Sequence, residues 1–290
     1  MRVVVLDGDL QKRVPGATVR IGRTRLRGNR SGIAAVHMTP RTVLVRVSAP
    51  GYSPAAAYVN FRRKPSFIFR VYQPRLQWTM YGADPAHSGV HTGPRLRPPF
   101  RIVWSLAHGD LIEFPAVVSD GFAYVANGRG TIRAFSMRDG TLAWRHATGT
   151  IMASSLAIWG DKLVAHGMGD GRVRVLDRRS GRVLWSRRVG SAIESSPVVR
   201  YGIDYFGTRS GDVYALNLRT NKVRWVYRTG AKITASVSLA GRTAYVGNYA
   251  GRVVALSTRS GRPRWTSSVN GRVYGTAPVA DGRLFVPSST

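Results

Sequence analysis

Short apolar runs separated by turn residues dominate the chain after residue 100. The runs are rich in Val, Ile, Tyr and Ala and are bounded by Gly, Asp, Ser or Asn, as in "FAYVAN" and "TAYVGN". Such runs predict short antiparallel strands, because β-branched and aromatic residues suit a pleated, half-buried surface. No stretch has the apolar period of an amphipathic helix. The pattern therefore predicts an all-β protein.

The strand pattern repeats every 40 or 41 residues. The stretches "GTIRAFSMRDGTLAW", "GRVRVLDRRSGRVLW", "GDVYALNLRTNKVRW" and "GRVVALSTRSGRPRW" each hold two strands and a turn and end on a Trp. A unit of this length with four short strands is typical of a β-propeller blade, since stacking around an axis buries both faces of each sheet. The period is marked by five tryptophans: Trp104, Trp144, Trp185, Trp225 and Trp265.

A small residue accompanies the Trp in every full unit. It stands ten residues earlier, on the third strand, where it leaves room for the indole to fill the space between blades and to donate its N–H to a carbonyl. A constant phase of one aromatic per repeat favours core packing over a ligand platform. These small residues are Ala134, Val175, Ala215 and Ala255.

The turns carry a more specific resemblance. "ALNLRTNKVRW" and "VLDRRSGRVLW" resemble the tryptophan-docking repeat of PQQ-like (quinoprotein-type) β-propellers, Ala-x-Asp-x-x-Thr-Gly-x-x-x-Trp. The lead-in "QWTMYGADPAHSG" is similar to the segment that opens such propellers, so the resemblance covers residues 77–290. The docking positions that it implies are Ala215, Asn217, Thr220 and Trp225 in one blade and Val175, Asp177, Gly181 and Trp185 in another. The departures are Asn221, where the family has Gly, and Ser136 and Ser257, where it has Asp.

The resemblance implies two classes of function. Some family members are dehydrogenases that hold PQQ and Ca²⁺ with carboxylates and amides, use an Asp base and usually carry a vicinal Cys pair. Others, such as the BamB-type proteins of β-barrel assembly, bind no quinone. This chain has no Cys, and its sequence has no acidic cluster suited to a hard cation. The sequence therefore favours a noncatalytic binding or scaffold protein without a cofactor, with a PQQ-dependent dehydrogenase as the alternative.

Residues 1–75 lack the repeat. Alternating segments such as "VVVLDGDLQKRVPGATVRI" and "TVLVRVSAPGY" predict a small β-sandwich. The order "VPGATVRI", "GNRSGIA", "VRVSAPGY" resembles the carboxypeptidase-regulatory-like (transthyretin-like) module, which implies turns at Gly16, Gly32 and Gly51 and a packed Tyr52. Residues 76–103 are rich in Pro and Gly and predict a linker that wraps onto the propeller of residues 104–290.

The count of repeats predicts an incomplete propeller. The fourth full unit ends at Trp265, and "VYGTAPVADGRLFVPSST" adds two strands of a further blade. Trp104 corresponds to a fourth strand without its first three. Four full repeats and a partial one allow a five-blade ring with a defective last sheet, but the family resemblance implies more blades and therefore favours a truncated larger propeller.

The chain is strongly basic, with 44 Lys and Arg against 14 Asp and Glu and a formal net charge of +30. Such a charge suits an anionic partner, and binding of a polyanion or nucleic acid is a second alternative function. However, the arginines recur at the hairpins ("RRSG", "RTNK", "RSGR") and form no dense tract. We therefore expect a compositional bias, and a partner that is another protein or an anionic cell-envelope polymer rather than nucleic acid.

The family resemblance implies an extracytoplasmic location, secreted or in the cell envelope. The opening "MRVVVLDGD" has no features of a signal peptide, so an export signal is not present in this sequence. No window approaches the roughly 20 apolar residues that cross a bilayer. The absence of Cys excludes disulfides and thiolate catalysis.

Glu113 and Glu194 are the only glutamates, and both stand four residues after the Gly that opens a blade. The other blades carry Ala153, Thr234 and Gly275 at this spacing. Because the first strand of a blade lines the central channel, both carboxylates are candidate channel-lining residues. They either form a ligand, cation or general-base site, or neutralise nearby arginines, and the sequence favours the second.

Other titratable residues predict no catalytic, cofactor or metal site. Asp84, His87 and His91 suit a metal by type, but they stand in a Pro/Gly loop, where turn capping by Asp84 is the better expectation. His108, His146 and His166 are scattered and show no Ser or Asp arrangement of a triad.

Overall fold

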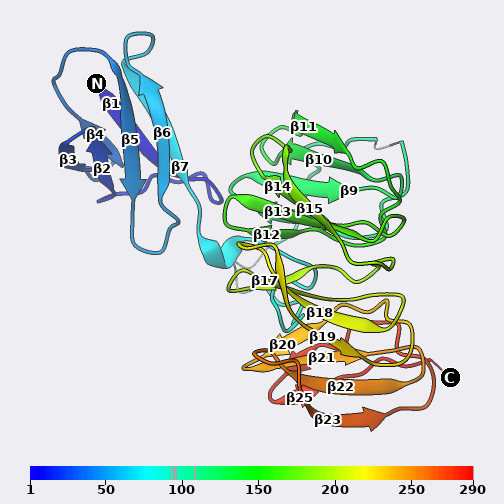
Figure 1. Ribbon diagram of the computed structural model, residues 1–290. Coiled ribbons are helices and arrows are strands. Elements are labelled where there is room, and N and C mark those ends of the chain that lie inside the picture. The colour runs from blue at the N-terminus through cyan, green and yellow to red at the C-terminus, as the bar shows by residue number, and fades with distance from the viewer. Residues whose placement is uncertain (92, 94–96, 108, 290) are drawn as a thin grey trace. The chain divides into compact units, whose positions relative to one another are not determined.

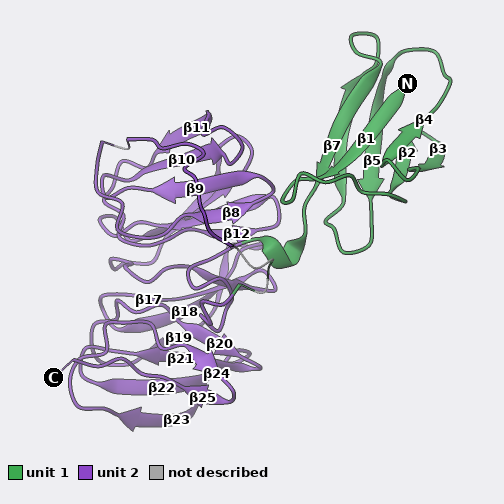
Figure 2. Ribbon diagram, turned by 180° about the vertical axis from the view of Figure 1, so that it is seen from behind, with its two compact units in different colours: residues 1–77, 91–96 green, residues 78–90, 97–290 purple. Residues whose placement is uncertain are grey.

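The computed structural model describes residues 1–91, 93, 97–107 and 109–289. It divides into two compact units, an N-terminal unit of residues 1–77 and 91–96 and a propeller unit of residues 78–90 and 97–290 (Figure 2). Within the described residues, no helix is both long enough and apolar enough to span a membrane. The one helical element in the described part of the chain is a short 3-10 turn, η1 (Pro74–Leu76).

The N-terminal unit consists of two β-sheets that enclose one apolar core (Figure 1). One sheet has the order β4-β1-β7 and the other β3-β2-β5-β6. Alternating burial along the strands sends Val19, Val45 and Val47 into the core and leaves polar neighbours outside. The strands are β1 (Arg2–Asp7), β2 (Thr18–Ile21), β3 (Thr24–Arg27), β4 (Ile33–Ala35), β5 (Thr42–Ser48), β6 (Ala55–Asn60) and β7 (Ser66–Val71).

The propeller unit contains four antiparallel four-stranded blades in chain order, followed by a two-stranded hairpin. This arrangement confirms the predicted fold class. Blade 1 comprises β8 (Val117–Ser119), β9 (Phe122–Ala126), β10 (Thr131–Ser136) and β11 (Leu142–Ala147). Blade 2 comprises β12 (Ala157–Trp159), β13 (Lys162–His166), β14 (Arg172–Asp177) and β15 (Val183–Arg188). Blade 3 comprises β16 (Val198–Arg200), β17 (Ile203–Gly207), β18 (Asp212–Asn217) and β19 (Lys222–Arg228). Blade 4 comprises β20 (Ser238–Ala240), β21 (Thr243–Gly247), β22 (Arg252–Ser257) and β23 (Pro263–Ser268). The hairpin is β24 (Val279–Ala280) with β25 (Arg283–Leu284).

Three of the tryptophans contact the following blade through their indole N–H groups. In each blade the Trp pairs across the sheet with the small residue of the third strand, next to a β-bulge, and all four small residues are fully buried. The indole N–H groups of Trp104, Trp144 and Trp225 donate to the carbonyl oxygens of Met137, Arg178 and Thr258 at 3.0, 3.0 and 3.1 Å. Each acceptor lies in the turn between the third and fourth strands of the following blade. The Trp thus ties one blade to the next.

The same turns explain the Gly of the docking repeat. Gly181 has a φ of +71°, and a Cβ there would lie 2.4 Å from the Trp144 ring. Asn221 replaces this Gly in blade 3 and keeps a positive φ of 54°, a conformation that Asn tolerates better than most residues. The departure from the family pattern therefore preserves the backbone of the turn.

Residues 78–90 form a lead-in that runs across the first strands of the blades. Trp78 bridges to Val118 of blade 1, and the N–H groups of Ile158, Leu239 and Val279 donate to carbonyl oxygens of Thr79, Pro85 and Ala86. The four blade residues stand at the same position of the repeat. The lead-in therefore joins blades 1, 2 and 4 and the terminal hairpin.

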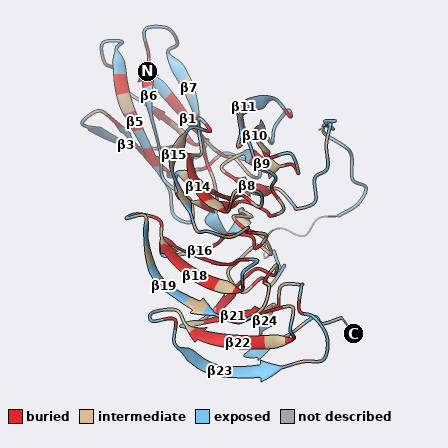
Figure 3. Ribbon diagram, turned by 45° about the vertical axis from the view of Figure 1, so that its right-hand side comes forward, coloured by how far each residue is buried: buried red, intermediate tan, exposed pale blue. Residues whose placement is uncertain are grey.

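The blade edges differ from the sequence expectation at one point. No strand is assigned to residues 101–107, where the sequence predicts a fourth strand around Trp104. The Trp104 indole nevertheless packs on Gly140 of blade 1 as a docking residue. At the other end, Trp265 is 43% exposed, whereas Trp225 is 8% exposed beneath the turn of blade 4. Figure 3 shows β23 exposed beside the largely buried β22.

Candidate functional site

The segment that leads into the first strand of a blade makes the same backbone hydrogen bond in blades 2, 3 and 4, so these segments lie at one repeating level of the propeller. The amides of Met168, Arg209 and Tyr249 donate to carbonyl oxygens of Ile151, Ala192 and Lys232. Each bond joins the turn after the second strand of a blade to the segment that leads into the first strand of the same blade. The Ile233 amide in turn donates to the carbonyl oxygen of Thr208, which joins this segment of blade 4 to the turn of blade 3 at the same level.

Glu194 is the centre of a charged cluster at this level. Its Oε1 atom lies 3.2 Å from the Arg209 Nε atom and 3.7 Å from the Lys232 Nζ atom, and its side chain is 18% exposed. The Lys232 ammonium also lies 4.8 Å from the centre of the Tyr249 ring, within cation–π range. Two cations on one carboxylate leave the cluster with a positive charge. The cluster can therefore bind an anionic or polar group.

Glu113 stands at the same position in blade 1 but is exposed. The two glutamates therefore do not form one paired site. The hydrogen bonds between blades also correct the register of the last unit: the Thr234 hydroxyl donates to the carbonyl of Tyr274, and the Ser236 amide to the Thr276 hydroxyl, both 40 residues on. Tyr274, and not Gly275, is the counterpart of the two glutamates.

Exposed apolar side chains occur in the corresponding segments of other blades. Leu111, Ile112, Ile151 and Tyr274 are each more than two-fifths exposed. Exposed apolar side chains that gather at one level, beside Arg and Tyr, are typical of a protein-binding surface. We call this set the inner-end surface: Leu111, Ile112, Ile151, Glu194, Arg209, Lys232, Tyr249 and Tyr274.

Hydroxyl groups of successive blades form a ladder of hydrogen bonds two residues along the chain from the Glu position of the inner-end surface. The Ser155 amide donates to the Ser196 Oγ atom, the Ser196 amide to the Ser236 Oγ atom, and the Ser236 amide to the Thr276 Oγ1 atom, each at 3.0 Å. Each hydroxyl satisfies a backbone donor of the preceding blade that would otherwise be unpaired between the sheets. The ladder fixes the spacing of the first strands. Its sequence signal is a hydroxyl residue two positions after the Glu position, in "ASSL", "ESSP", "TASV" and "YGTA".

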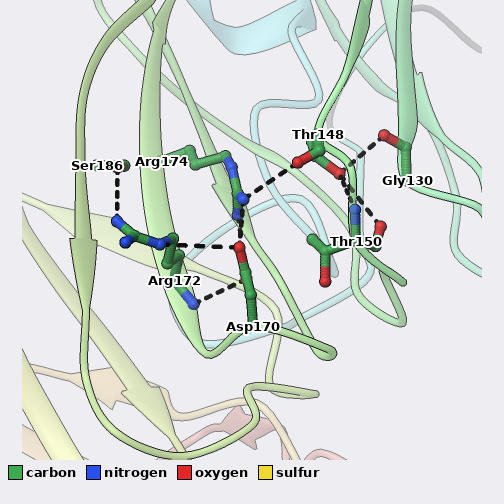
Figure 4. Close-up of polar contacts among 7 residues, drawn as sticks. All are labelled: Gly130, Thr148, Thr150, Asp170, Arg172, Arg174 and Ser186. Carbon is green, nitrogen blue, oxygen red and sulfur yellow. Dashed lines mark hydrogen bonds and ion pairs between the residues drawn. The ribbon is translucent and has the colours of Figure 1, made fainter.

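A second network braces the junction of blades 1 and 2 (Figure 4). The Arg174 guanidinium pairs with the Asp170 carboxylate and donates to the Thr148 carbonyl, and the Thr148 hydroxyl donates to the carbonyl of Gly130 at 2.9 Å. Burial raises the pKa of Asp170, but the hydrogen bond and charge of Arg174 outweigh it and lower the pKa below 3.8. Asp170 is therefore ionised near neutral pH and holds the junction closed.

A buried His–Asp pair joins blades 2 and 3, which corrects the expectation that His166 has no Asp partner. The His166 Nε2 atom lies 2.9 Å from the Asp204 Oδ2 atom, and the Nδ1 atom lies 2.7 Å from the Ser195 carbonyl oxygen. Both side chains are 0% exposed, so no substrate reaches them. Gly207 and Gly247 occupy the His position in blades 3 and 4, so His166 departs from the repeat. This departure is the sequence signal that could have revealed the pair. His108 lies outside the described residues.

The described contacts of the Pro/Gly loop residues are structural, as the position of these residues predicts: Asp84, His87 and His91. The Asp84 carboxylate accepts the amides of Ala86 and Ser88 and the Ser88 hydroxyl, which confirms the predicted turn cap. The His87 ring lies 3.0 Å, through Nε2, from the carbonyl oxygen of Val237, and burial lowers the pKa of His87. His91 belongs to the N-terminal unit and accepts the amide of Gly93.

The donor groups do not fit the PQQ and Ca²⁺ that the resemblance implies for dehydrogenases. Ca²⁺ takes six to eight oxygen ligands. Among the described residues, no three Asp, Glu or His side chains gather closely enough to hold a metal ion. The Glu194 carboxylate is already held by Arg209 and Lys232, whose charges oppose a second cation.

Comparisons with known proteins agree with this architecture. The chain aligns with a europium-containing methanol dehydrogenase at 16% identity and a TM-score of 0.58, over 67% of this chain and 49% of that one. It aligns with the quinohemoprotein alcohol dehydrogenase of Comamonas testosteroni at 16% identity and a TM-score of 0.55, over 73% and 45%. The chain thus spans less than half of either enzyme, and at this identity the likeness shows the fold alone. BamB from Moraxella catarrhalis aligns over 93% of both chains at 16% identity, with a TM-score of 0.47.

A comparison of the sequence with protein families identifies the family. No curated protein matches the chain significantly. Residues 101–226 and 209–290 match the protein family described as outer membrane protein assembly factor BamB. These ranges include all four blades, the terminal hairpin and the whole inner-end surface. Because the match spans well over half of the residues, the chain belongs to this BamB family of PQQ-like β-propeller proteins.

Proposed function

We propose that the chain is a noncatalytic extracytoplasmic binding or scaffold protein whose propeller engages another protein through the inner-end surface. The observation that carries the proposal is the composition of that surface. Exposed Leu111, Ile112 and Ile151 lie at the same level as Arg209 and Tyr249. Aromatic residues and Arg are the types most often found at binding hot spots, and a polar border around apolar anchors is typical of interfaces.

The charge of the surface favours an acidic partner segment. Arg209 and Lys232 share the single carboxylate of Glu194, so one positive charge stays available to the partner. A partner carboxylate beside the Lys232 ammonium would gain a charge-assisted hydrogen bond. Membership of the BamB family supports both the protein-binding role and the extracytoplasmic location.

The alternative function is a PQQ-dependent oxidoreductase. It finds support in the fold shared with the two dehydrogenases, while the donor set around Glu194 opposes it. The discriminating experiment incubates the full chain with PQQ and Ca²⁺ and measures reduction of an artificial electron acceptor with primary alcohols. The proposal predicts no rate above the protein-free control. A protein-dependent rate that is lost in E194Q would overturn it.

A further inference from the structure

A row of three arginines crosses the four-stranded sheet of the N-terminal unit. Arg20 of β2 pairs directly with Arg25 of β3 on one side and with Arg46 of β5 on the other. Ala56 of β6 closes the row opposite Arg46. Since side chains alternate along a strand and the neighbours of Arg20 and Arg46 are buried in the core, all three arginines lie on the outer face of this sheet.

The row lines a hollow in that face. A cavity of about 460 Å³ is bordered by the three arginines and by small residues of β2, β5 and β6: Thr18, Ser48, Ala55 and Ala56. This volume lies within the roughly 300–1,000 Å³ of small-ligand pockets. The small Ala side chains leave room for the guanidinium groups to contact a bound ligand.

The positive charge of the row has no ion-pair partner among the described residues. None of the ion pairs that involve described residues includes Arg20, Arg25 or Arg46. Residues 1–77 contain 15 Lys and Arg but only two acids, Asp7 and Asp9. Both carboxylates are engaged elsewhere. Asp7 accepts Tyr52 and Gln73, and Asp9 accepts Gln77 and the Gln73 amide.

Such a row is costly for a sheet that binds nothing. Like charges directly opposite each other on neighbouring strands destabilise the pair. Edge strands often carry charges that prevent association with other sheets. That explanation does not extend to Arg20 and Arg46, because β2 and β5 are the two inner strands of the order β3-β2-β5-β6.

We propose that this cavity is a binding site for a small ligand that carries two or three linked phosphate groups. Neighbouring strands lie about 4.8 Å apart, so Arg25 and Arg46 begin roughly 10 Å from each other with Arg20 between them. Each guanidinium offers five N–H donors in a planar fork that matches phosphate oxygens. One carboxylate has two oxygens and satisfies one fork, whereas a chain of phosphates presents oxygens and charge along the whole row. The site lies in the N-terminal unit and is independent of the function proposed for the propeller.

Inorganic tripolyphosphate is the probe that tests the site. Calorimetric titration of the full chain at fixed ionic strength should detect saturable binding, and citrate should bind at least tenfold more weakly. R20Q/R46Q should weaken tripolyphosphate binding at least tenfold. R41Q/R63Q, which removes the same charge from exposed positions outside the cavity, should change the affinity less than twofold. Equal losses in the two variants would overturn the proposal, because they would reduce binding to net charge.

Three further measurements test the role of the guanidinium groups, the folding of the variant and the class of ligand. R20K/R46K retains the charge but not the fork, so its affinity should fall several-fold; an unchanged affinity would contradict recognition by the guanidinium groups. Without ligand and at low salt, R20Q/R46Q should unfold at the same or a higher urea concentration than the natural chain, which shows that lost binding is not lost folding. Tighter binding of single-stranded DNA than of tripolyphosphate at the same salt, lost in R20Q/R46Q, would overturn the ligand class.

Discussion

Substitution of one docking glycine provides a quantitative test of the contact between blades. Gly181 and Gly190 both have a left-handed backbone, with φ values of +71° and +87°. A Cβ on Gly181 would lie 2.4 Å from the Trp144 ring, whereas a Cβ on Gly190 meets no atom within 4 Å. An L-residue in this conformation costs about 1–2 kcal/mol. Overpacking against a held side chain adds about 1–3 kcal/mol.

We therefore expect G190A to lower the free energy of unfolding by about 1–2 kcal/mol and G181A by about 1–3 kcal/mol more. Urea unfolding of the full chain, followed by tryptophan fluorescence and near-UV circular dichroism, measures both variants. In W144A the extra cost of G181A over G190A should vanish, because the ring that it meets is gone. Equal destabilisation by the two alanines in the natural chain would refute the docking geometry.

Three further predictions concern the contacts between blades. S196A should cost about 1–3 kcal/mol in urea unfolding because it leaves a buried amide unpaired, whereas S195A, which removes a hydroxyl that has no partner, should cost close to nothing; similar losses would contradict the ladder. D204A should cost about 3 kcal/mol by leaving the buried His166 ring without its partner, and D204N, which keeps an acceptor oxygen, should recover most of this; an unaffected D204A would refute the pair. Because the folded pKa of Asp170 lies below 3.8, its stabilisation is present above about pH 4 and is lost as the pH falls through the lowered value. The stability difference between the natural chain and D170N should therefore be constant above about pH 5 and shrink toward pH 2, and a difference that persists at pH 2 would contradict this assignment.

The repeat allowed most of the propeller to be predicted from the sequence. A period of 40 or 41 residues, with a Trp and a small residue in constant phase, is a local pattern that needs no knowledge of long-range contacts. The docking of Trp144 on the next blade follows because the indole is the largest side chain that the pattern repeats. The partial last blade was predicted for the same reason, and β24 and β25 confirm its two strands.

The charged cluster could not be predicted in the same way. Arg209 and Lys232 come from the turn after β17 and from the segment before β20, and only backbone hydrogen bonds within blade 3 and between blades 3 and 4 bring them to Glu194. Counting four residues from the opening Gly selected Gly275 in the last unit, one residue away from Tyr274. That Gly lies in a connection between blades whose length varies, so it is a poor reference point for the phase.

The other two sites depended on pairing that the sequence does not reveal. His166 and Asp204 each break the repeat, and a repeat-based analysis treats exceptions as noise unless their neighbours in the adjoining blade are known. The arginine row depends on the register of three strands. A shift of one residue in β3 would place Leu26 and not Arg25 opposite Arg20.

Site-specific photo-crosslinking tests the central claim most directly. The natural chain is produced in its own cells with a photoreactive residue either at Ile151, in the inner-end surface, or at Tyr201, an exposed position in the turn between β16 and β17. The proposed function predicts one discrete protein adduct from position 151 that is lost when R209E is added, and no such adduct from position 201. The absence of an adduct at 151, or the same adducts from both positions, would contradict a protein-binding inner-end surface.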